Sequence, residues 1–317
     1  MMRYADVSSH HNGKRDSMFS RRHPYLYFIL VFTAIVSATT IITGMLSMVG
    51  SRLSKLSFGE KVGVVEVSAM IIDARDYIDQ IKTFAKNDAV KAIVVRIDSP
   101  GGAVAPSQEI FQEIRKAAAV KPVIASMGTI ATSGGYYIAA AATGIIANPG
   151  TITGSIGVIL GYTNFEKLFE KIGLYPVVIK SGQYKDIASP VREMTPEEKA
   201  LLQNFSDGVH NQFIEHVAEG RGMAVDEIRQ IADGRIFTGE TALALGLVDR
   251  LGNLEDAIEW AGRESGIKGA IDTVYPPEKK LPILRYLMEE AVSEIRTILG
   301  SRGGASPITG GYIYLPE

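Results

Sequence analysis

The spacing of apolar residues divides this chain into segments of different kinds. Residues 1–24 are polar, mixed in charge and without periodicity, which is typical of a disordered tail. Residues 25–49 hold no charged side chain and are mostly apolar. As one helix, such a segment is long enough to cross the roughly 30 Å of hydrocarbon in a bilayer. Residues 50–60 show neither pattern, and they predict a linker.

From residue 61 onward, short apolar runs alternate with stretches of helical periodicity. The run at 92–97 (AIVVRI) has the composition of a strand buried on both faces of a sheet. Strands are expected at 62–70, 92–97, 122–127, 144–147, 155–160 and 176–179, and helices at 73–86, 104–119, 138–142, 196–219, 238–245 and 254–264. Strands that recur with helices between them predict βαβ units, parallel pairing and an α/β fold.

The alternation ends near two consecutive prolines, Pro276 and Pro277. We therefore expect a main domain at 61–270, a helical extension at 271–300 with a helix at 284–299, and a tail at 301–317. The tail is rich in glycine but carries Tyr312, Tyr314 and Leu315. It is either a disordered terminus or an extended strand that fills a groove of the main domain.

The charges that flank the apolar segment predict its orientation. Five basic residues precede it and three follow it closely: Arg3, Lys14, Arg15, Arg21 and Arg22, against Arg52, Lys55 and Lys61. The positive-inside rule then places residues 1–24 in the cytoplasm and the main domain outside the cell membrane, as a single-pass protein. A cleaved signal peptide is the alternative, but signal-peptide cores are normally only about 7–15 residues long.

Composition excludes several classes of chemistry. The net charge of −2 and the pI near 6.3 give no sign of nucleic-acid binding. Cysteine is absent, which removes thiol nucleophiles, disulfides and thiolate metal sites. Of the five histidines, only His210 and His216 follow the apolar segment. They stand six apart on a predicted helix, so we expect surface histidines rather than metal ligands, and we expect neither a metal nor a cofactor.

The stretch 128–142, GTIATSGGYYIAAAA, places Ser133 between a predicted strand and an alanine-rich helix. A serine at such a turn has an exposed hydroxyl and faces the positive end of the helix dipole. The two glycines that follow would let a substrate backbone come close without meeting a Cβ atom. The alternative is that Ser133 only caps the helix, because serine is a favoured N-cap residue.

Three further turns carry polar or glycine residues at strand ends. Asp98-Ser-Pro-Gly-Gly102 follows a buried strand, where backbone N–H groups of Gly101 and Gly102 could form an oxyanion hole. Thr153-Gly-Ser-Ile-Gly157 contains Ser155, which could orient a catalytic amine by a hydrogen bond. Ordinary turn chemistry is the simpler explanation of the first motif when it is taken alone, and it is the alternative for Thr153 and Ser155.

Lys185 lies in the third turn, SGQYKDIASP at 181–190. Lysine is ordinarily protonated at neutral pH, but burial in an apolar crevice disfavours the ammonium form. A neutral Lys185 could accept the proton of Ser133 and so replace a catalytic histidine. A solvated loop lysine is the plain alternative.

Together these motifs resemble the signal peptide peptidase A family. The matching segments are SPGG at 99–102, TSGGYYIA at 132–139, TGSIGV at 153–158, SGQYKDIASP at 181–190 and GRIFTGETALALGLVD at 234–249. The resemblance implies a membrane-bound serine endopeptidase on the Clp/crotonase fold, built of repeated ββα/βαβ units after one transmembrane helix. It implies Ser133 as nucleophile, Lys185 as general base, Ser155 as the residue that orients the lysine, and Gly101 and Gly102 as oxyanion donors. Signal-peptide remnants or unfolded peptide segments would be the substrates.

Other functions remain open from the sequence. A stomatin-associated membrane Ser-Lys protease shares the PGG loop, although the GGYY and KDxxSP segments differ from that family. A crotonase-like acyl-thioester enzyme would need neither Lys185 nor an anchor, and an inactive scaffold would need neither dyad residue. Members of the resembling family with two repeats hold the lysine in one repeat and the serine in the other. No internal repeat is visible here, so we expect a homo-oligomeric ring in which neighbouring subunits complete each dyad.

Overall fold

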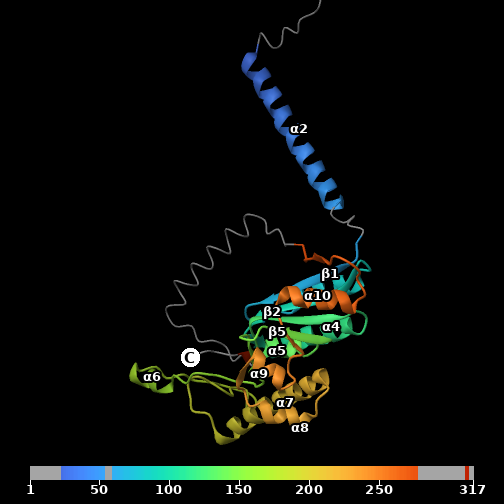
Figure 1. Ribbon diagram of the computed structural model, residues 1–317. Coiled ribbons are helices and arrows are strands. Elements are labelled where there is room, and N and C mark those ends of the chain that lie inside the picture. The colour runs from blue at the N-terminus through green and yellow to red at the C-terminus, as the bar shows by residue number, and fades with distance from the viewer. Residues whose placement is uncertain (1–22, 54–58, 278–310, 314–317) are drawn as a thin grey trace, which may run out of the picture. The chain divides into compact units, whose positions relative to one another are not determined.

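A computed structural model describes residues 23–53, 59–277 and 311–313 of the chain (Figure 1). The chain separates into two units, residues 1–58 and 59–317. The first contains α2 (Pro24–Leu53), whose described side chains are exposed. Within α2, the span Pro24–Gly44 has the length and composition needed to cross a membrane, a test that a signal sequence near the amino terminus also passes. The helix ends at Leu53, so residues 50–53 are helical rather than part of the expected linker.

The second unit is built on a mostly parallel sheet. Its central strands are β2 (Val90–Ser99) and β4 (Val123–Thr132), which pair in parallel, and β1 (Lys61–Ser68) pairs in parallel with β2. These strands are apolar on both faces because helices cover both sides of the sheet. The sheet has eight strands, and six of them follow the order β7 (Ile236–Thr238), β6 (Ile152–Gly154), β4, β2, β1 and β9 (Asp272–Val274). The other two branch from this path: β5 (Gly144–Ala147) pairs with β4, and β8 (Arg250–Leu251) pairs with β5. Within this sheet only the β6–β7 pair is antiparallel.

The long strand β4 divides its partners between its two halves. Residues 124–127 pair with β5 (Gly144–Ala147), and residues 130–132 pair with β6 (Ile152–Gly154). The short outer strands are β7 (Ile236–Thr238), β8 (Arg250–Leu251) and β9 (Asp272–Val274). The carboxyl end of β4 therefore lies beside β6, and Ser133 follows directly after it.

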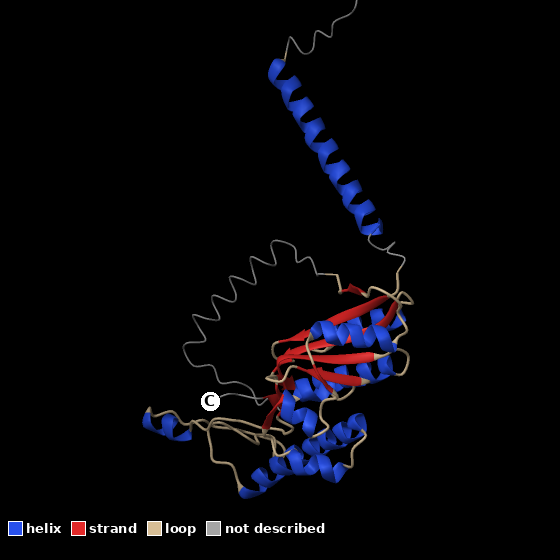
Figure 2. Cartoon of the chain, viewed as in Figure 1, coloured by secondary structure: helices blue, strands red, loops and turns tan. Residues whose placement is uncertain are grey.

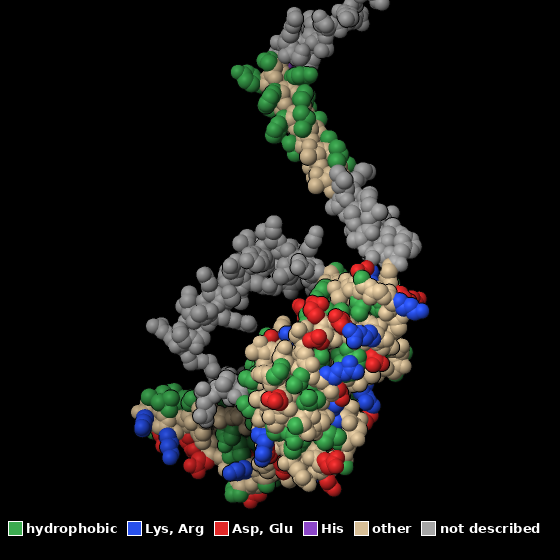
Figure 3. All heavy atoms as spheres, viewed as in Figure 1, with side chains coloured by type: hydrophobic (Ala, Val, Ile, Leu, Met, Phe, Trp, Pro, Cys, Tyr) green, Lys and Arg blue, Asp and Glu red, His purple; other side chains and the backbone are tan. Residues whose placement is uncertain are grey.

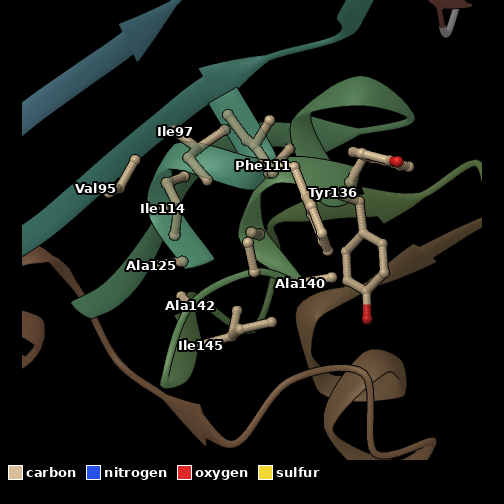
Figure 4. Packing of buried hydrophobic residues seen from close by; sticks show 14 of the residues in the cluster. Val95, Ile97, Phe111, Ile114, Ala125, Tyr136, Ala140, Ala142 and Ile145 are labelled. Carbon is tan, nitrogen blue, oxygen red and sulfur yellow. The ribbon is translucent and has the colours of Figure 1, made fainter. Parts of the chain in front are cut away.

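Helices cover the two faces of the sheet unequally (Figure 2). One face packs against α3 (Arg75–Lys86), α4 (Val104–Ala118) and α5 (Gly134–Ala139), and the other against α10 (Leu254–Glu264). The larger core lies under α4 and α5, where Phe111 and Tyr136 are fully buried (Figure 4). The buried Tyr136 hydroxyl donates a hydrogen bond to the Leu247 carbonyl at 3.0 Å, which ties α5 to the segment around Leu247.

A long helix, α7 (Pro196–Arg221), packs beside α5 and begins as its sequence predicts. Thr195 and Glu198 form a reciprocal capping box, with Pro196 at the first helical position. Two short helices follow, α8 (Val225–Ile231) and α9 (Gly239–Ala244).

Several predicted elements are wrong. Residues 155–160 and 176–179 form no strand. They belong to an arm, 155–195, that begins at the buried Ser155 and Ile156, is largely exposed beyond them, carries the short helix α6 (Glu166–Lys171) and protrudes from the sheet domain (Figure 1). A short apolar run does not by itself distinguish a buried strand from an exposed segment without regular structure. At the other end, Asp272–Val274 is a strand rather than helix, and it extends the sheet past residue 270. The helix expected at 284–299 lies outside the described residues.

A second, two-stranded sheet lies next to Ser133. Strand β3 (Gly101–Ala103) pairs antiparallel with β10 (Gly311–Ile313) from the chain's tail. The register sets Tyr312 opposite Gly102. The tail therefore contributes an extended strand to the main domain, which is the second of the two alternatives left open by the sequence.

Candidate active site

Ser133 is placed by a backbone turn that few residues adopt. Its φ of 54° and ψ of −118° lie in a region that favours glycine, directly between β4 and α5. A hydrogen bond from the Ser133 N–H to the Gly154 carbonyl, at 2.8 Å, and one from the Tyr137 N–H to the Ser133 carbonyl hold this turn from both sides. Such strain persists only where the surroundings fix it, and it concentrates at functional sites.

The helix-cap alternative for Ser133 is not supported by this geometry. The residue stands at the N-cap position of α5, yet its side chain makes no capping hydrogen bond. By contrast, the hydroxyl of Thr238 accepts the Thr241 N–H at the start of α9. We expected an exposed Ser133 hydroxyl, but the side chain is buried, with 1% of the residue exposed, and β10 lies in contact with α5 at this place.

The Gly101–Gly102 loop lies against the residue that follows Ser133. A Cβ atom on Gly134 would stand 3.2 Å from the Gly102 nitrogen and 3.3 Å from the Gly101 Cα. Only glycine fits at position 102, because a Cβ atom there would lie 2.0 Å from the Ile71 carbonyl oxygen. The Gly101 N–H donates to the Ser99 hydroxyl at 3.1 Å, so in this conformation it is already occupied.

Gly134 is a candidate that the sequence reasoning did not name as a donor. It is the first residue of α5, and the first-turn N–H groups of a helix have no partner within the helix. Gly134 lies close to Gly102, so backbone N–H groups from two different loops lie near Ser133. The signal was present in the sequence, as a glycine directly after a serine at a strand-to-helix turn.

Ser155, like Ser133, has a positive φ. Ala69, Ser133, Ser155 and Ala188 are the residues other than glycine with positive φ in the described part of the chain. Ser155, with φ of 51°, follows Gly154 directly, and its N–H donates to the Arg235 carbonyl at 2.8 Å. Ser155 is buried, so the structure brings Ser133, the Gly101–Gly102 loop and Ser155 to one end of β4 and β6.

Lys185 does not join this group within one chain. It is exposed in a turn at residues 182–188 of the arm, and its amine makes no hydrogen bond or ion pair with any described residue. The expected burial of Lys185 in an apolar crevice is thus not found in the isolated chain. Its neighbour Asp186, however, is held in an ion-pair network with Lys180, Arg192 and Glu198.

The arm exposes an unusual number of large apolar side chains (Figure 3). Tyr175 is 81% exposed, Val177 is 86% exposed and Ile179 is 97% exposed. The others that are at least two-fifths exposed are Ile159, Tyr162, Leu168, Ile172, Leu174, Val178 and Tyr184. Large exposed apolar surfaces are often sites of contact with another molecule.

A groove beside β3 offers a place for substrate side chains. It has a volume of about 680 Å³ and begins at Ala103 and Val104, directly after the glycine loop. Its walls are mainly apolar and come from three parts of the chain: Val104, Pro106, Val158, Leu160, Leu202 and Phe205. A peptide strand paired with β3 could therefore place an apolar side chain here.

Neither His210 nor His216 is a free surface residue, contrary to the expectation from the sequence. His216 hydrogen-bonds to the Tyr137 hydroxyl and stacks on Phe111 at a centroid distance of 4.9 Å. Burial raises the pKa of Tyr137 to about 12, so its hydroxyl stays protonated. His210 lies 3.2 Å from the Ile156 carbonyl oxygen. Both histidines are half-buried and tie α7 to the site's framework, and no cluster of metal-ligating side chains occurs among the described residues.

Comparison with known proteins agrees with this geometry. Residues 115–268 match the model of peptidase family S49, and residues 64–151 match that of Clp protease. A putative protease of Synechocystis is 46% identical over 238 residues, which cover 74% of this chain and 84% of that protein. The chloroplastic serine protease SPPA of Arabidopsis thaliana is 36% identical over 75% of this chain but 36% of its own length. Protease 4 of Salmonella typhi is 36% identical over 69% of this chain and 35% of its own length.

These similarities and the parallel sheet identify a Clp-protease-like fold and a protease function. The chain belongs to peptidase family S49, the signal peptide peptidase A family.

Proposed function

We propose that this protein is a membrane-anchored serine endopeptidase that degrades cleaved signal peptides and other peptides released from the membrane. The observation that carries the proposal is that Ser133 lies next to β3, a strand with an edge on which an extended strand can pair. Ser133 sits in a strained turn without a capping role, and β3 beside it accepts an extended strand in antiparallel pairing. Strand addition of this kind is how many proteases and peptide-binding domains hold an extended peptide.

The chemistry follows from the groups around Ser133. A neutral Lys185 takes the proton of the Ser133 hydroxyl, and the oxygen attacks the carbonyl carbon of the scissile bond. The N–H of Gly134 and those of the Gly101–Gly102 loop stabilise the negative charge on the carbonyl oxygen; for Gly101, its bond to Ser99 must first open. The lysine ammonium then protonates the leaving amine. Lys185, neutral again, takes a proton from a water molecule whose oxygen attacks the acyl carbon; the ester bond to Ser133 breaks, and the lysine ammonium returns its proton to the Ser133 oxygen.

The same chain does not supply both members of the dyad in contact, so we place the dyad between subunits. Lys185 is exposed on the arm, which also exposes many of its apolar side chains. If the arm packs on a second copy of the chain, that contact covers its apolar residues and delivers Lys185 to the neighbour's Ser133. A head-to-tail contact of this kind closes into a ring when the rotation allows it. A ring would enclose the sites and admit unfolded segments only.

The membrane anchor is supported by the side chains of α2. Thr33, Thr39, Thr40 and Thr43 each donate their hydroxyl hydrogen to the carbonyl four residues earlier, at 2.6–2.7 Å. Polar groups satisfied within the helix are compatible with a lipid environment. We propose an amino terminus in the cytoplasm and a catalytic domain outside. A membrane-impermeant serine-directed probe added to intact cells should then label Ser133; labelling only after lysis would reverse the proposed orientation.

A fluorophosphonate probe tests the catalytic assignment. The Ser133 oxygen should attack the phosphorus of the probe and displace fluoride, which leaves a stable covalent adduct found on Ser133 by peptide mass mapping. Ser133→Ala should not label, and Lys185→Ala should label much more slowly. Ser155→Ala retains the nucleophile but removes the residue proposed to orient Lys185, so it should still label at Ser133, more slowly than the wild type. Labelling of another residue at the same rate in Ser133→Ala would refute the assignment.

A further inference from the structure

The turn that carries Lys185 is held by one arginine whose hydrogen-bonding capacity is completely used. Arg192 has five N–H donors, and each has an acceptor. The Nε group donates to Asp186 Oδ2 at 2.9 Å. Nη1 donates to Glu198 Oε2 at 2.8 Å and to the Glu193 carbonyl at 2.9 Å. Nη2 donates to Glu198 Oε1 at 2.5 Å and to the Asp186 carbonyl at 3.1 Å.

These contacts join Lys185 to a rigid part of the fold. Glu198 is buried, with its side chain 4% exposed, and its carboxylate also accepts the Thr195 N–H in the capping box of α7. The Arg192 hydrogen bonds hold the pKa of Glu198 down at about 2, so it is ionised throughout the neutral range. Asp186 follows Lys185 directly in the chain. The Arg192 guanidinium donates hydrogen bonds to both the side chain and the backbone carbonyl of Asp186. It therefore fixes the backbone one residue from Lys185.

Two further contacts hold the same turn. Lys180 pairs with the second oxygen of Asp186 and donates to the Gln183 carbonyl at 2.9 Å. Ala188 is buried in a left-handed conformation with φ of 58°, so the chain after Asp186 has little freedom. The amine of Lys185 has no such contact and extends from a turn whose backbone is fixed. A mobile loop would not need this much anchoring.

We infer that Arg192 is a positioning residue for the general base: with Glu198 and Asp186 it holds the Lys185 turn against α7 so that the lysine amine meets the serine of the neighbouring subunit. The inference rests on the proposed role of Lys185. It assigns Arg192 no contact with substrate. It predicts that lysine cannot replace arginine at position 192. A lysine has three donors on a single nitrogen, whereas the planar guanidinium donates five hydrogen bonds in different directions.

Arg221 provides a matched control on the opposite end of α7. It too donates to a backbone carbonyl and to both oxygens of a carboxylate: Gly246 at 3.0 Å, and Asp249 at 3.0 and 2.6 Å. Its side chain is 7% exposed, against 29% for Arg192, so its loss should disturb the fold at least as much. It has no contact with the arm or with Lys185. Any effect on turnover that Arg192 variants show beyond Arg221 variants therefore reports on the lysine turn.

The experiment compares Arg192→Lys, Arg192→Gln, Arg221→Lys and Lys185→Arg in the full-length protein in detergent. For each, kcat and KM are measured on one peptide substrate, together with the thermal midpoint and the mass of the assembly. We expect both Arg192 variants to lose about 10- to 100-fold in kcat, the range expected when a reacting group is displaced by about 1 Å. KM should stay within about threefold, because the peptide binds at β3 rather than at Arg192. The assembly should keep its mass.

The outcomes separate this inference from the proposed function. If Arg192→Lys and Arg221→Lys have equal kcat while Lys185→Arg is inactive, the dyad stands and the positioning role of Arg192 is wrong. If Lys185→Arg is fully active, Lys185 is not the base, and the assignment of both residues falls. If Arg192→Gln fails to fold, Arg192→Lys and Glu198→Gln decide: normal kcat in both would overturn the inference, and reduced kcat at unchanged KM in both would support it.

Discussion

Replacing Ser133 separates its proposed catalytic role from its structural role. The Ser133 hydroxyl makes no capping hydrogen bond, so Ser133→Ala removes a group that contributes little to the fold. We expect the free energy of unfolding to change by less than about 0.5 kcal/mol, the usual range where no named stabilising interaction is lost. A true serine cap would cost about 0.5–2 kcal/mol on the same replacement. Peptidase activity should be lost.

Ser133→Gly goes further, because it also relieves backbone strain. The conformation with φ of 54° and ψ of −118° costs a residue with a side chain about 1–3 kcal/mol. Glycine avoids this strain but adds about 0.4–1 kcal/mol of unfolded-state entropy. The difference predicts that Ser133→Gly is more stable than Ser133→Ala by about 1 kcal/mol. For a domain of this size that corresponds to a rise of about 2–4 °C in thermal midpoint.

Thermal and urea unfolding of the two variants, both inactive, provide the assay. Using two inactive proteins removes any contribution from bound peptide, and the same detergent and protein concentration keep the assembly constant. A Ser133→Gly variant that melts below Ser133→Ala would show that the turn is not strained as described. A loss of 1–2 kcal/mol in Ser133→Ala would restore the cap explanation.

Three further predictions concern the base, the tail and the acid side of stability. Lys185→Arg should lower kcat by about 10²–10⁴-fold, since guanidinium cannot act as a base at any accessible pH. If kcat of the variant, measured as a function of pH, stays at the wild-type level, Lys185 is not the general base. Truncation after Gly300 deletes β10 and should lower KM for short peptides, because the tail then no longer occupies β3; an unchanged KM would return the tail to a passive terminus. Glu198 has its pKa lowered from 4.5 to about 2 by Arg192, so its stabilising contribution is complete above pH 4.5 and is lost as the pH falls toward 2. Unfolding of Glu198→Gln should lack this part of the pH dependence, and an identical profile in both proteins would contradict the role of the pair.

The sequence was sufficient where local pattern and tertiary packing agree. The strand at 144–147 and the helix at 254–264 are found at their predicted residues, because short apolar runs in a parallel sheet and a capped amphipathic helix leave few alternatives. The helix predicted at 196–219, from Thr195 as N-cap and Pro196 at the first helical position, begins where expected and ends two residues later, at Arg221. Each of these elements buries its apolar face within its own chain.

Prediction failed where the covering partner or the backbone strain is not encoded locally. The apolar runs at 155–160 and 176–179 were read as strands, but they lie in an arm that exposes Val177 and Ile179. Nothing in the local pattern distinguishes a strand that pairs inside the chain from a segment that another molecule covers. Likewise, the positive φ values of Ser133 and Ser155 are imposed by their neighbours rather than by residue type, since serine itself disfavours them. The strand pairing of residues 311–313 with β3 was one of two alternatives, because glycine-rich tails fit both.

The dyad between subunits is tested most directly by mixing two inactive variants. Ser133→Ala and Lys185→Ala subunits are each inactive alone, but in a mixed assembly some contacts pair an intact Ser133 with an intact Lys185 from the neighbouring subunit. The two proteins are dissociated, combined in equal amounts and reassembled, with wild-type protein carried through the same steps, and mixing is verified by mass. Our account predicts that peptidase activity returns in the mixture, together with fluorophosphonate labelling of the Lys185→Ala subunits at Ser133. Fully mixed assemblies that stay inactive, beside wild-type controls that recover, would place both residues within one chain and contradict it.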